Sequence, residues 1–339
     1  MRILAVNYEY TLTGSALLLL RLAEHLREAG HEVSVCAAIP GNGPIREAYR
    51  ERGFVVLDAR GTASIDVAIC NTVMTAPQLL ELSGSARTIW WIHEEKLGLL
   101  HLLQNPSQIA AFERASAVVF PVAYLRDAVY RSCLYNQDPN RIAIIPAGIP
   151  PIDIEPAPRP DDRTFRLVSV GSVYPRKRHA DLIRAVALYS GPAKCIIAGK
   201  YHTVPEDCLQ LVAAAPDRYE LVGEVDRERV LRLVAAADAF CLPSDSEVLP
   251  LATLEAAMLE RPMILTDLPT YDGVWRHGRN CLLCPAGAIG MLAQSIAMLA
   301  GNVELRSRLG AAARRTAAPY TEAAFFSRFD ALLSSLSAS

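Results

Sequence analysis

The sequence predicts an α/β protein built from two doubly wound parallel sheets. Its 339 residues exceed what one hydrophobic core usually serves, which favours two domains. Short apolar runs alternate with longer amphipathic segments in both halves of the chain, a pattern typical of parallel strands covered by helices on both faces. A proline-rich segment over 146–163 separates the halves and is interpreted as a linker, because proline continues neither a helix nor a central strand.

The first half alternates predicted strands and helices. A helix predicted over 16–29 ends before Gly30, and glycine directly after the last helical residue is a common stop. The strands are predicted at 3–6, 33–37, 67–70, 88–92, 117–120 and 142–145.

The same alternation restarts after the linker. Strands are predicted at 167–170, 195–198, 220–221, 239–242 and 263–266, and helices at 178–188, 227–236 and 251–260. We therefore expect an N-terminal Rossmann-like domain over 1–155 and a C-terminal one over 156–317. Ligands of such sheets bind outside the carboxyl ends of the strands, so two domains facing a cleft would hold two substrates opposite each other.

Composition disfavours several classes of function. A formal net charge of −2 argues against nucleic-acid binding through a general basic field. Mean hydropathy is slightly positive, at +0.19, but no apolar run reaches the roughly 20 residues of a spanning helix. The apolar run 1–7 is short and is interpreted as a buried strand rather than a signal peptide. We expect a cytoplasmic protein.

The eight cysteines predict neither an oxidising compartment nor a metal site. Several lie in apolar runs, where cysteine behaves as a small buried hydrophobe. Cys281 and Cys284 have the C-x-x-C spacing of redox and zinc sites, but no second pair and no histidine cluster accompanies them. No D-x-D motif ends a predicted strand. We therefore expect no metal and no cofactor.

Two carboxylates bracket the start of a predicted helix in the second half. Glu247 lies in the loop before the helix, Pro250 suits its first position, and Glu255 lies more than one turn inside. The free N–H groups and dipole of a helix N-terminus favour an anion. A diphosphate there would lie between two carboxylates that accept hydrogen bonds from sugar hydroxyls. Two glutamates at this spacing also occur by chance, so the pair alone does not settle the function.

A basic loop follows the first strand of the second half. The strand runs into Gly171, which lets a ligand approach the backbone, and Arg176, Lys177 and Arg178 follow before a helix. Such side chains neutralise phosphate, and the alternative is a solvated basic helix start. The sequence has neither a dinucleotide-binding glycine motif after a strand nor a P-loop, which disfavours an oxidoreductase or a P-loop NTPase.

In combination these motifs resemble the retaining, GT-B fold glycosyltransferases of family 4, also described as glycosyl transferases group 1. The resemblance covers nearly the whole chain and is most specific over 167–285. The matching stretches are 145–149, 170–172 with 176–177, 197–199, 222–225, 236–239, 243–244, 247 with 255–256, 262–264 and 278–280.

The resemblance implies a role for each matching donor-side residue. Glu247 would bind the donor sugar and Glu255 the ribose, while Lys177 with Arg176 would bind the diphosphate. The stretch 224–225 would lie near the nucleobase. The remaining donor-side positions are Gly171, Ser172, Gly199, Lys200, Glu224, Val225, Val248, Leu249, Pro250 and Leu251.

Two stretches depart from the family pattern. Ser172 stands where the family usually has arginine, which moves the phosphate charge onto Lys177 and Arg176. The stretch 248–250 is Val-Leu-Pro where the family often has Gly-Phe-Gly, and the proline removes one N–H that could bind phosphate.

The first half carries fewer matches. Gly14 and Ser15 resemble a shortened form of the family's glycine-rich loop, although an ordinary capped turn is the alternative. His93 follows a strand and matches a family position that faces the donor sugar, so the resemblance makes it a catalytic candidate with Glu247 and Lys177. Glu94 would touch the acceptor. The segment 318–339 resembles the family's last helix, which packs back on the first domain.

The resemblance implies transfer of a sugar from a nucleotide sugar to a hydroxyl of a sugar, glycan, glycoconjugate or lipid-linked acceptor. The transfer would need no metal ion and would retain the configuration at the anomeric carbon. It would serve the biosynthesis of a glycan, polysaccharide or glycoconjugate. Closure of the linker would exclude water. Another GT-B enzyme, such as a sugar-nucleotide epimerase or phosphorylase, and a non-catalytic nucleotide-sugar-binding protein remain alternatives.

Three residues of the first half leave a further role open. Arg126 and Arg131 would suit contact with an anionic acceptor, and together with Tyr124 a peripheral contact with the inner membrane face, although a solvated helix face is the simpler interpretation. The sequence predicts no oligomeric state.

Overall fold

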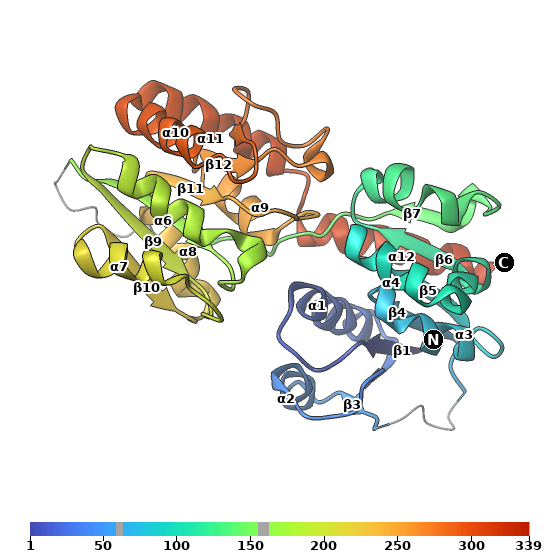
Figure 1. Cartoon of the computed structure of the whole chain (residues 1–339). Coiled ribbons are helices and arrows are strands. Elements are labelled where there is room, and N and C mark those ends of the chain that lie inside the picture. The colour runs from blue at the N-terminus through green and yellow to red at the C-terminus, as the bar shows by residue number, and fades with distance from the viewer. Residues whose placement is uncertain (59–63, 155–162, 339) are drawn as a thin grey trace. The chain divides into compact units, whose positions relative to one another are not determined.

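The computed structural model of the chain describes residues 1–58, 64–154 and 163–338 (Figure 1). It divides into two compact units. Unit 1 comprises Met1–Gly148 and Glu322–Ser339, and unit 2 comprises Ile149–Thr321. Residues 155–162 of the predicted linker lie outside the described residues.

Unit 1 is built on a seven-stranded parallel sheet with the order β3-β2-β1-β4-β5-β6-β7. The order reverses between β1 and β4, and such a reversal is where doubly wound sheets bind ligands. The strands are β1 (Arg2–Asn7), β2 (Glu32–Ala37), β3 (Val55–Val56), β4 (Val67–Asn71), β5 (Arg87–Trp91), β6 (Ala117–Phe120) and β7 (Ile142–Ile144). The helices are α1 (Gly14–Glu28), α2 (Pro44–Glu51), α3 (Ala76–Leu82), α4 (Lys96–Gln104), α5 (Ala111–Arg114) and α12 (Glu322–Ala338).

The C-terminal helix α12 packs within unit 1. Its Phe325 and Phe329 are fully buried, and their rings lie 5.5 and 4.9 Å from the ring of Trp91 at the end of β5. Asp330 pairs with Nε2 of His25 at 2.9 Å. Aromatic burial of this kind dominates core energetics, so the last segment of the sequence completes the core of the first unit.

Unit 2 contains a six-stranded parallel sheet with the order β10-β9-β8-β11-β12-β13, which reverses between β8 and β11. The strands are β8 (Phe165–Val170), β9 (Ala193–Ala198), β10 (Tyr219–Gly223), β11 (Ala239–Leu242), β12 (Met263–Thr266) and β13 (Leu282–Cys284). The helices are α6 (His179–Leu188), α7 (Glu206–Ala214), α8 (Arg227–Ala236), α9 (Leu251–Met258), α10 (Ile289–Gly301) and α11 (Val303–Ala317).

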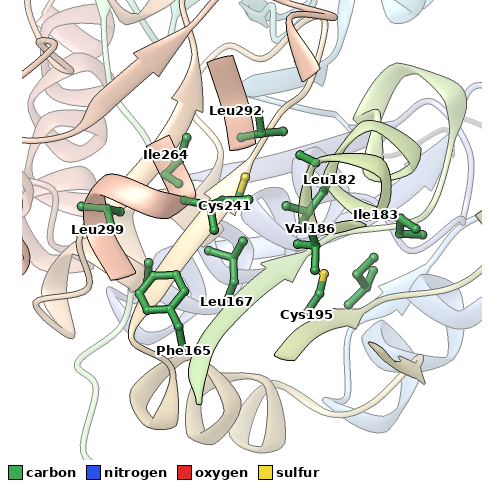
Figure 2. Close-up of a cluster of buried hydrophobic side chains, with 14 of the residues drawn as sticks. Phe165, Leu167, Leu182, Ile183, Val186, Cys195, Cys241, Ile264, Leu292 and Leu299 are labelled. Carbon is green, nitrogen blue, oxygen red and sulfur yellow. The ribbon is translucent and has the colours of Figure 1, made fainter. Parts of the chain in front are cut away.

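Both faces of the unit 2 sheet are buried, which explains the continuous apolar runs of its strands. On one face, Leu182 of α6 and Leu292 of α10 pack with Leu167 and Cys241 of the strands, as Figure 2 shows. The opposite face packs Val168 of β8 into a second cluster with residues of α8, α9 and α11. The prediction of two doubly wound parallel sheets is confirmed.

Helix boundaries differ from the sequence-based expectation by one or two residues at α1, which spans Gly14–Glu28 rather than 16–29, and at α9, which ends at Met258 rather than at 260. Helix α6 begins at His179 rather than Arg178, because a 3₁₀ turn over Pro175–Lys177 leaves Arg178 with a left-handed φ of 51°. The helix expected near Arg126 and Arg131 is a π-helical turn over Leu125–Val129 followed by a 3₁₀ turn over Arg131–Leu134.

Within the described ranges, every helix is too short or too polar to cross a bilayer.

Candidate functional site

The carboxyl ends of β8 and β11 lie side by side at the reversal point of unit 2. After β8 the chain passes Gly171 and makes the 3₁₀ turn Pro175–Lys177 before α6. After β11 it passes a polar loop over 243–250 before α9. The topology therefore brings the basic loop and the carboxylate loop to one edge of the sheet, where ligands of such sheets bind.

Two glycines bring backbones close together at this edge. Gly171 and Gly199 follow β8 and β9 and have φ values of 143° and 151°. A Cβ atom built on Gly199 would lie 2.1 Å from the carbonyl oxygen of Gly171. Glycine is therefore required at position 199 on steric grounds as well as for its backbone conformation.

We expect a Gly199→Ala variant to lose about 3 kcal/mol of unfolding free energy, because clash and backbone strain add. Urea unfolding followed by circular dichroism measures this loss. The matched control is Gly223→Ala, since Gly223 also has a positive φ, of 81°, but open space where Cβ would lie. A loss as small as the control's would contradict the close approach.

Lys177 and Glu247 form the central contact of the site. The Lys177 ammonium donates to Oε1 of Glu247 at 2.5 Å, and a guanidinium nitrogen of Arg176 lies 3.6 Å from the same oxygen. Glu247 is only 8% exposed, so its charge depends on these partners. The residues assigned to phosphate and to sugar thus lie in direct contact.

Backbone and side-chain hydrogen bonds join the basic loop to the carboxylate loop. The N–H of Asp245 donates to the carbonyl of Arg176 at 2.8 Å, and the Arg176 guanidinium donates to the carbonyl of Ser246. Arg178 pairs with Asp181 at 2.6 Å and with Asp245 at 3.0 Å. The charge of Arg178 is therefore balanced by two aspartates of the same unit, whereas Lys177 lies beside Glu247, the proposed sugar-binding carboxylate.

Glu255 has a partner that the sequence analysis missed. It is 9% exposed within α9, and Nε of Arg227, the first residue of α8, donates to its Oε1 at 2.8 Å. A positive side chain is unfavourable in the first turn of a helix, where the helix dipole is also positive. This unfavourable placement of Arg227 was the signal in the sequence that it has a specific partner. The contact fixes the direction of the Glu255 carboxylate.

The start of α9 suits an anion. Pro250 occupies the cap position rather than the first helical position, which Leu251 takes, and the Pro250 side chain makes no capping hydrogen bond. The N–H of Thr253 donates to the carbonyl of Pro250 at 3.1 Å, so the earlier N–H groups of the first turn, those of Leu251 and Ala252, lie at the positive end of the helix dipole.

Four other predicted donor-side residues are more exposed than Glu247 and Glu255. Lys200 and Glu224 have exposed side chains, and Ser172 and Val225 are partly buried. The carbonyl of Lys200 accepts from the N–H of Val173 at 2.8 Å, which joins the loops after β8 and β9. At these positions the backbone, rather than a side-chain contact, defines the edge of the site.

Among residues 1–58, 64–154 and 163–338, no group of three or more His, Cys, Asp or Glu side chains could hold a metal ion. Cys281 and Cys284 are buried free thiols, and Sγ of Cys284 lies 3.1 Å from Oγ of Ser295. The two cysteines of the C-x-x-C motif are therefore residues of the hydrophobic core.

His93 of unit 1 is fixed by a neighbouring strand end. Asn71 ends β4, and its amide nitrogen donates to the carbonyl of Ser15 at 3.1 Å, so its oxygen faces Nε2 of His93 at 2.7 Å. Burial lowers the pKa of His93 to about 3, so the imidazole is neutral near pH 7. Nε2 then donates to Asn71, and Nδ1 remains the acceptor nitrogen. Sequence could have flagged Asn71 as a polar residue closing an apolar strand.

Glu94 joins the ends of β4 and β5. Its Oε2 accepts the N–H of Val73 at 2.9 Å and that of His93 at 3.1 Å. Burial raises the pKa of Glu94, while these backbone bonds favour the charged form. Ser15 belongs to the first turn of α1, whose cap is Thr13, with Oγ1 accepting from the Ala16 N–H at 3.3 Å.

Comparisons with curated proteins find partial matches. The chain is 34% identical over 122 residues to the alpha-galactosylglucosyldiacylglycerol synthase of Streptococcus pneumoniae, covering 32% of this chain and 30% of that protein. It is 26% identical over 216 residues to the D-inositol 3-phosphate glycosyltransferase of Jonesia denitrificans, covering 56% and 50%. The chain thus spans half or less of the length of these two relatives.

Solved structures match over the full length. HepE of Anabaena in complex with UDP superposes with a TM-score of 0.82 at 16% identity, covering 99% of this chain and 100% of that one. Sucrose-phosphate synthase from Thermosynechococcus elongatus gives 0.77 at 17% identity, covering 99% of each. At such identities the likeness establishes the fold, and the expected GT-B architecture is confirmed.

Two family models divide the chain between them. The model described as glycosyl transferases group 1 matches residues 153–316, and the model described as glycosyl-transferase family 4 matches residues 1–116. The first match covers the edge that carries Lys177, Glu247 and Glu255, and the second covers His93 and Glu94. The chain therefore belongs to the GT-B fold glycosyltransferases of family 4, the glycosyl transferases group 1.

Proposed function

We propose that the protein transfers a sugar from a nucleoside-diphosphate sugar to an acceptor hydroxyl, with retention at the anomeric carbon and without a metal ion. The observation that carries the proposal is the contact of Lys177 with Glu247 at the reversal point of unit 2, beside the start of α9. Family membership supports the reaction class. HepE, with the same fold, was solved with UDP and with UDP-glucose, so UDP is the first nucleotide to test.

The donor diphosphate would bind Lys177 and the first-turn N–H groups of α9. The negative charge that builds on the leaving diphosphate is then stabilised by groups already in place, which is the most effective form of electrostatic catalysis. When the Lys177 ammonium pairs with the phosphate instead of with Glu247, the Glu247 carboxylate can accept hydrogen bonds from the sugar hydroxyls.

The ribose would bind Glu255, whose carboxylate Arg227 orients. Two adjacent ribose hydroxyls can donate to one carboxylate, so a fixed carboxylate direction favours a nucleotide over a free sugar phosphate. The glycines at 171 and 199 would let the nucleotide approach the backbone.

His93 would contact the sugar as a neutral hydrogen-bonding group rather than as an acid. Because its Nε2–H is committed to Asn71, the acceptor nitrogen Nδ1 is left for a hydroxyl. We propose that substitution occurs on one face of the sugar, with the leaving phosphate taking the proton of the acceptor hydroxyl as the new bond forms.

The experiment is NMR analysis of the product made from UDP-, GDP- or ADP-sugars, with acceptors supplied as a glycan mixture and EDTA present. We expect the anomeric configuration of the donor to be kept and the rate to be unaffected by EDTA. An inverted product would contradict the retaining mechanism, and loss of activity restored by Mg²⁺ would contradict metal independence. Isomerised or phosphorolysed donor in place of transfer would favour another GT-B activity.

A further inference from the structure

Arg178 occupies a backbone position that disfavours arginine on three grounds. It is the N-cap residue of α6 and has a left-handed φ of 51°, a conformation that strains an arginine but not a glycine. Its side chain makes no capping hydrogen bond within the described part of the chain, and its positive charge is placed at the positive end of the helix dipole. Residues that break local preference in this way are concentrated at functional sites.

The Arg178 guanidinium joins two segments that are far apart in the sequence. Its Nε donates to Oδ2 of Asp181, in the first turn of α6, at 2.6 Å. Its Nη1 donates to Oδ1 of Asp245, in the carboxylate loop, at 3.0 Å. On a third side it packs against Gly287, because a Cβ atom built there would lie 2.9 Å from Nη2. Arg178 thus connects the start of α6 to the carboxylate loop.

Asp245 contacts the residues on both sides of Lys177. Its carboxylate accepts from Arg178, and its backbone N–H donates to the carbonyl of Arg176 at 2.8 Å. Lys177 lies between these two arginines in the sequence, and Glu247 lies two residues after Asp245. The contacts of Asp245 therefore join the two loops beside the contact of Lys177 with Glu247.

The ion pairs of Arg178 are not needed for the stability of unit 2. Asp181 keeps a second partner, because Nη1 of Arg184 lies 3.4 Å from its Oδ1. The side chain of Asp245 is 43% exposed, so water replaces the guanidinium at little cost. Glycine at position 178 would also relieve the backbone strain and is an acceptable N-cap residue. The advantage of arginine must therefore lie outside folding.

We propose that Arg178 is a positioning residue for the donor nucleotide. By binding Asp245 it holds the basic loop and the carboxylate loop in the arrangement that the diphosphate requires, and it does not itself bind the diphosphate. Two loops that are already ordered raise affinity, because their ordering no longer opposes binding. This inference rests on the proposed function, since it takes the ligand to be a nucleoside diphosphate.

The first test compares stability with affinity in Arg178→Gly. We expect this variant to unfold at a urea concentration no lower than that of wild type and to bind the nucleoside diphosphate about tenfold more weakly. Circular dichroism in urea and isothermal titration calorimetry with UDP, GDP and ADP measure the two quantities. Unchanged affinity, or weaker binding accompanied by a lower unfolding midpoint, would overturn the proposal.

The matched control is Arg184→Ala. Arg184 shares Asp181 with Arg178, but its other partner is Asp207 of α7 rather than a residue of the carboxylate loop. We expect the affinity for nucleoside diphosphate to stay at the wild-type value in this variant. A loss equal to that in Arg178→Gly would show that the effect comes from Asp181 and not from the joined loops.

Asp245→Ala separates positioning from direct contact with phosphate. If Arg178 acts through Asp245, this variant should weaken binding by a similar factor, and the double variant should bind no more weakly than either single variant. A guanidinium that binds phosphate would instead be released by Asp245→Ala, and binding would become stronger. Stronger binding would therefore overturn the proposal.

Hydrogen exchange in the ligand-free protein separates this inference from the proposed function. The Asp245 N–H bonds to the carbonyl of Arg176, so its exchange rate reports how firmly the loops are joined. We expect exchange about tenfold faster in Arg178→Gly and unchanged in Arg184→Ala. Wild-type protein that binds none of the nucleotides would contradict the proposed function, and the exchange rates would still decide whether Arg178 joins the loops. Nucleotide binding with unchanged exchange and affinity in Arg178→Gly would refute the role of Arg178 alone.

Discussion

Replacement of Glu247 by alanine is expected to lower the rate of sugar transfer about a thousandfold, the scale on which removal of one preorganised polar group acts in other enzymes. Glu247 is buried and receives both Lys177 and Arg176 in the absence of substrate. The substitution removes the carboxylate that accepts hydrogen bonds from the hydroxyls of the donor sugar. It also leaves Lys177 and Arg176 without the group that positions them. Initial rates with radiolabelled donor measure the effect.

Two further variants control the experiment with Glu247. Glu228→Ala removes an exposed glutamate of the same unit, which pairs with Arg232, and should leave the rate within twofold. Glu247→Gln keeps the shape of the side chain and tests whether the charge is needed. Transfer near the wild-type rate in a folded Glu247→Ala protein would refute the role assigned to Glu247.

Replacement of Lys177 by alanine is expected to weaken binding of the matching nucleoside diphosphate tenfold to a hundredfold. A hydrogen bond to a charged group contributes about 1.5–3 kcal/mol, which corresponds to that range of affinity. Ser172 has no charge to compensate, because the family's arginine is absent at that position. Isothermal titration calorimetry with UDP, GDP and ADP measures the change.

The matched control for Lys177 is Lys194→Ala, since Lys194 pairs with Glu220 on neighbouring strands away from the loop edge. It should leave nucleotide affinity unchanged. Equal affinities in wild type and Lys177→Ala would show that the diphosphate does not bind the basic loop.

The fold could be predicted because inner strands such as β6 and β11 are buried at every residue and contain only apolar residues. Turn details could not be predicted in the same way. The left-handed Arg178 is held by its ion pairs with Asp181 and Asp245, and Asp245 lies far along the chain. Such distant contacts override local preference, so the start of α6 shifted by one residue.

The candidate site was predictable where a sequence motif coincides with a strand end. Lys177 and Glu247 came from two such motifs, and the structure places them in contact. Asn71 and Arg227 were missed because each is a single polar or charged residue at the end of a strand or the start of a helix, outside any motif. Their roles come from contacts with His93 and Glu255, which only the three-dimensional structure reveals.

The central claim is that the edge of unit 2 where β8 and β11 end binds a nucleoside diphosphate. A crystal structure of the protein with the nucleoside diphosphate that calorimetry selects tests it most directly. The account predicts phosphate oxygens about 3 Å from Nζ of Lys177 and from the first N–H groups of α9, with the ribose hydroxyls on Glu255. A nucleotide bound elsewhere, or one that leaves the Lys177–Glu247 contact intact, would contradict it.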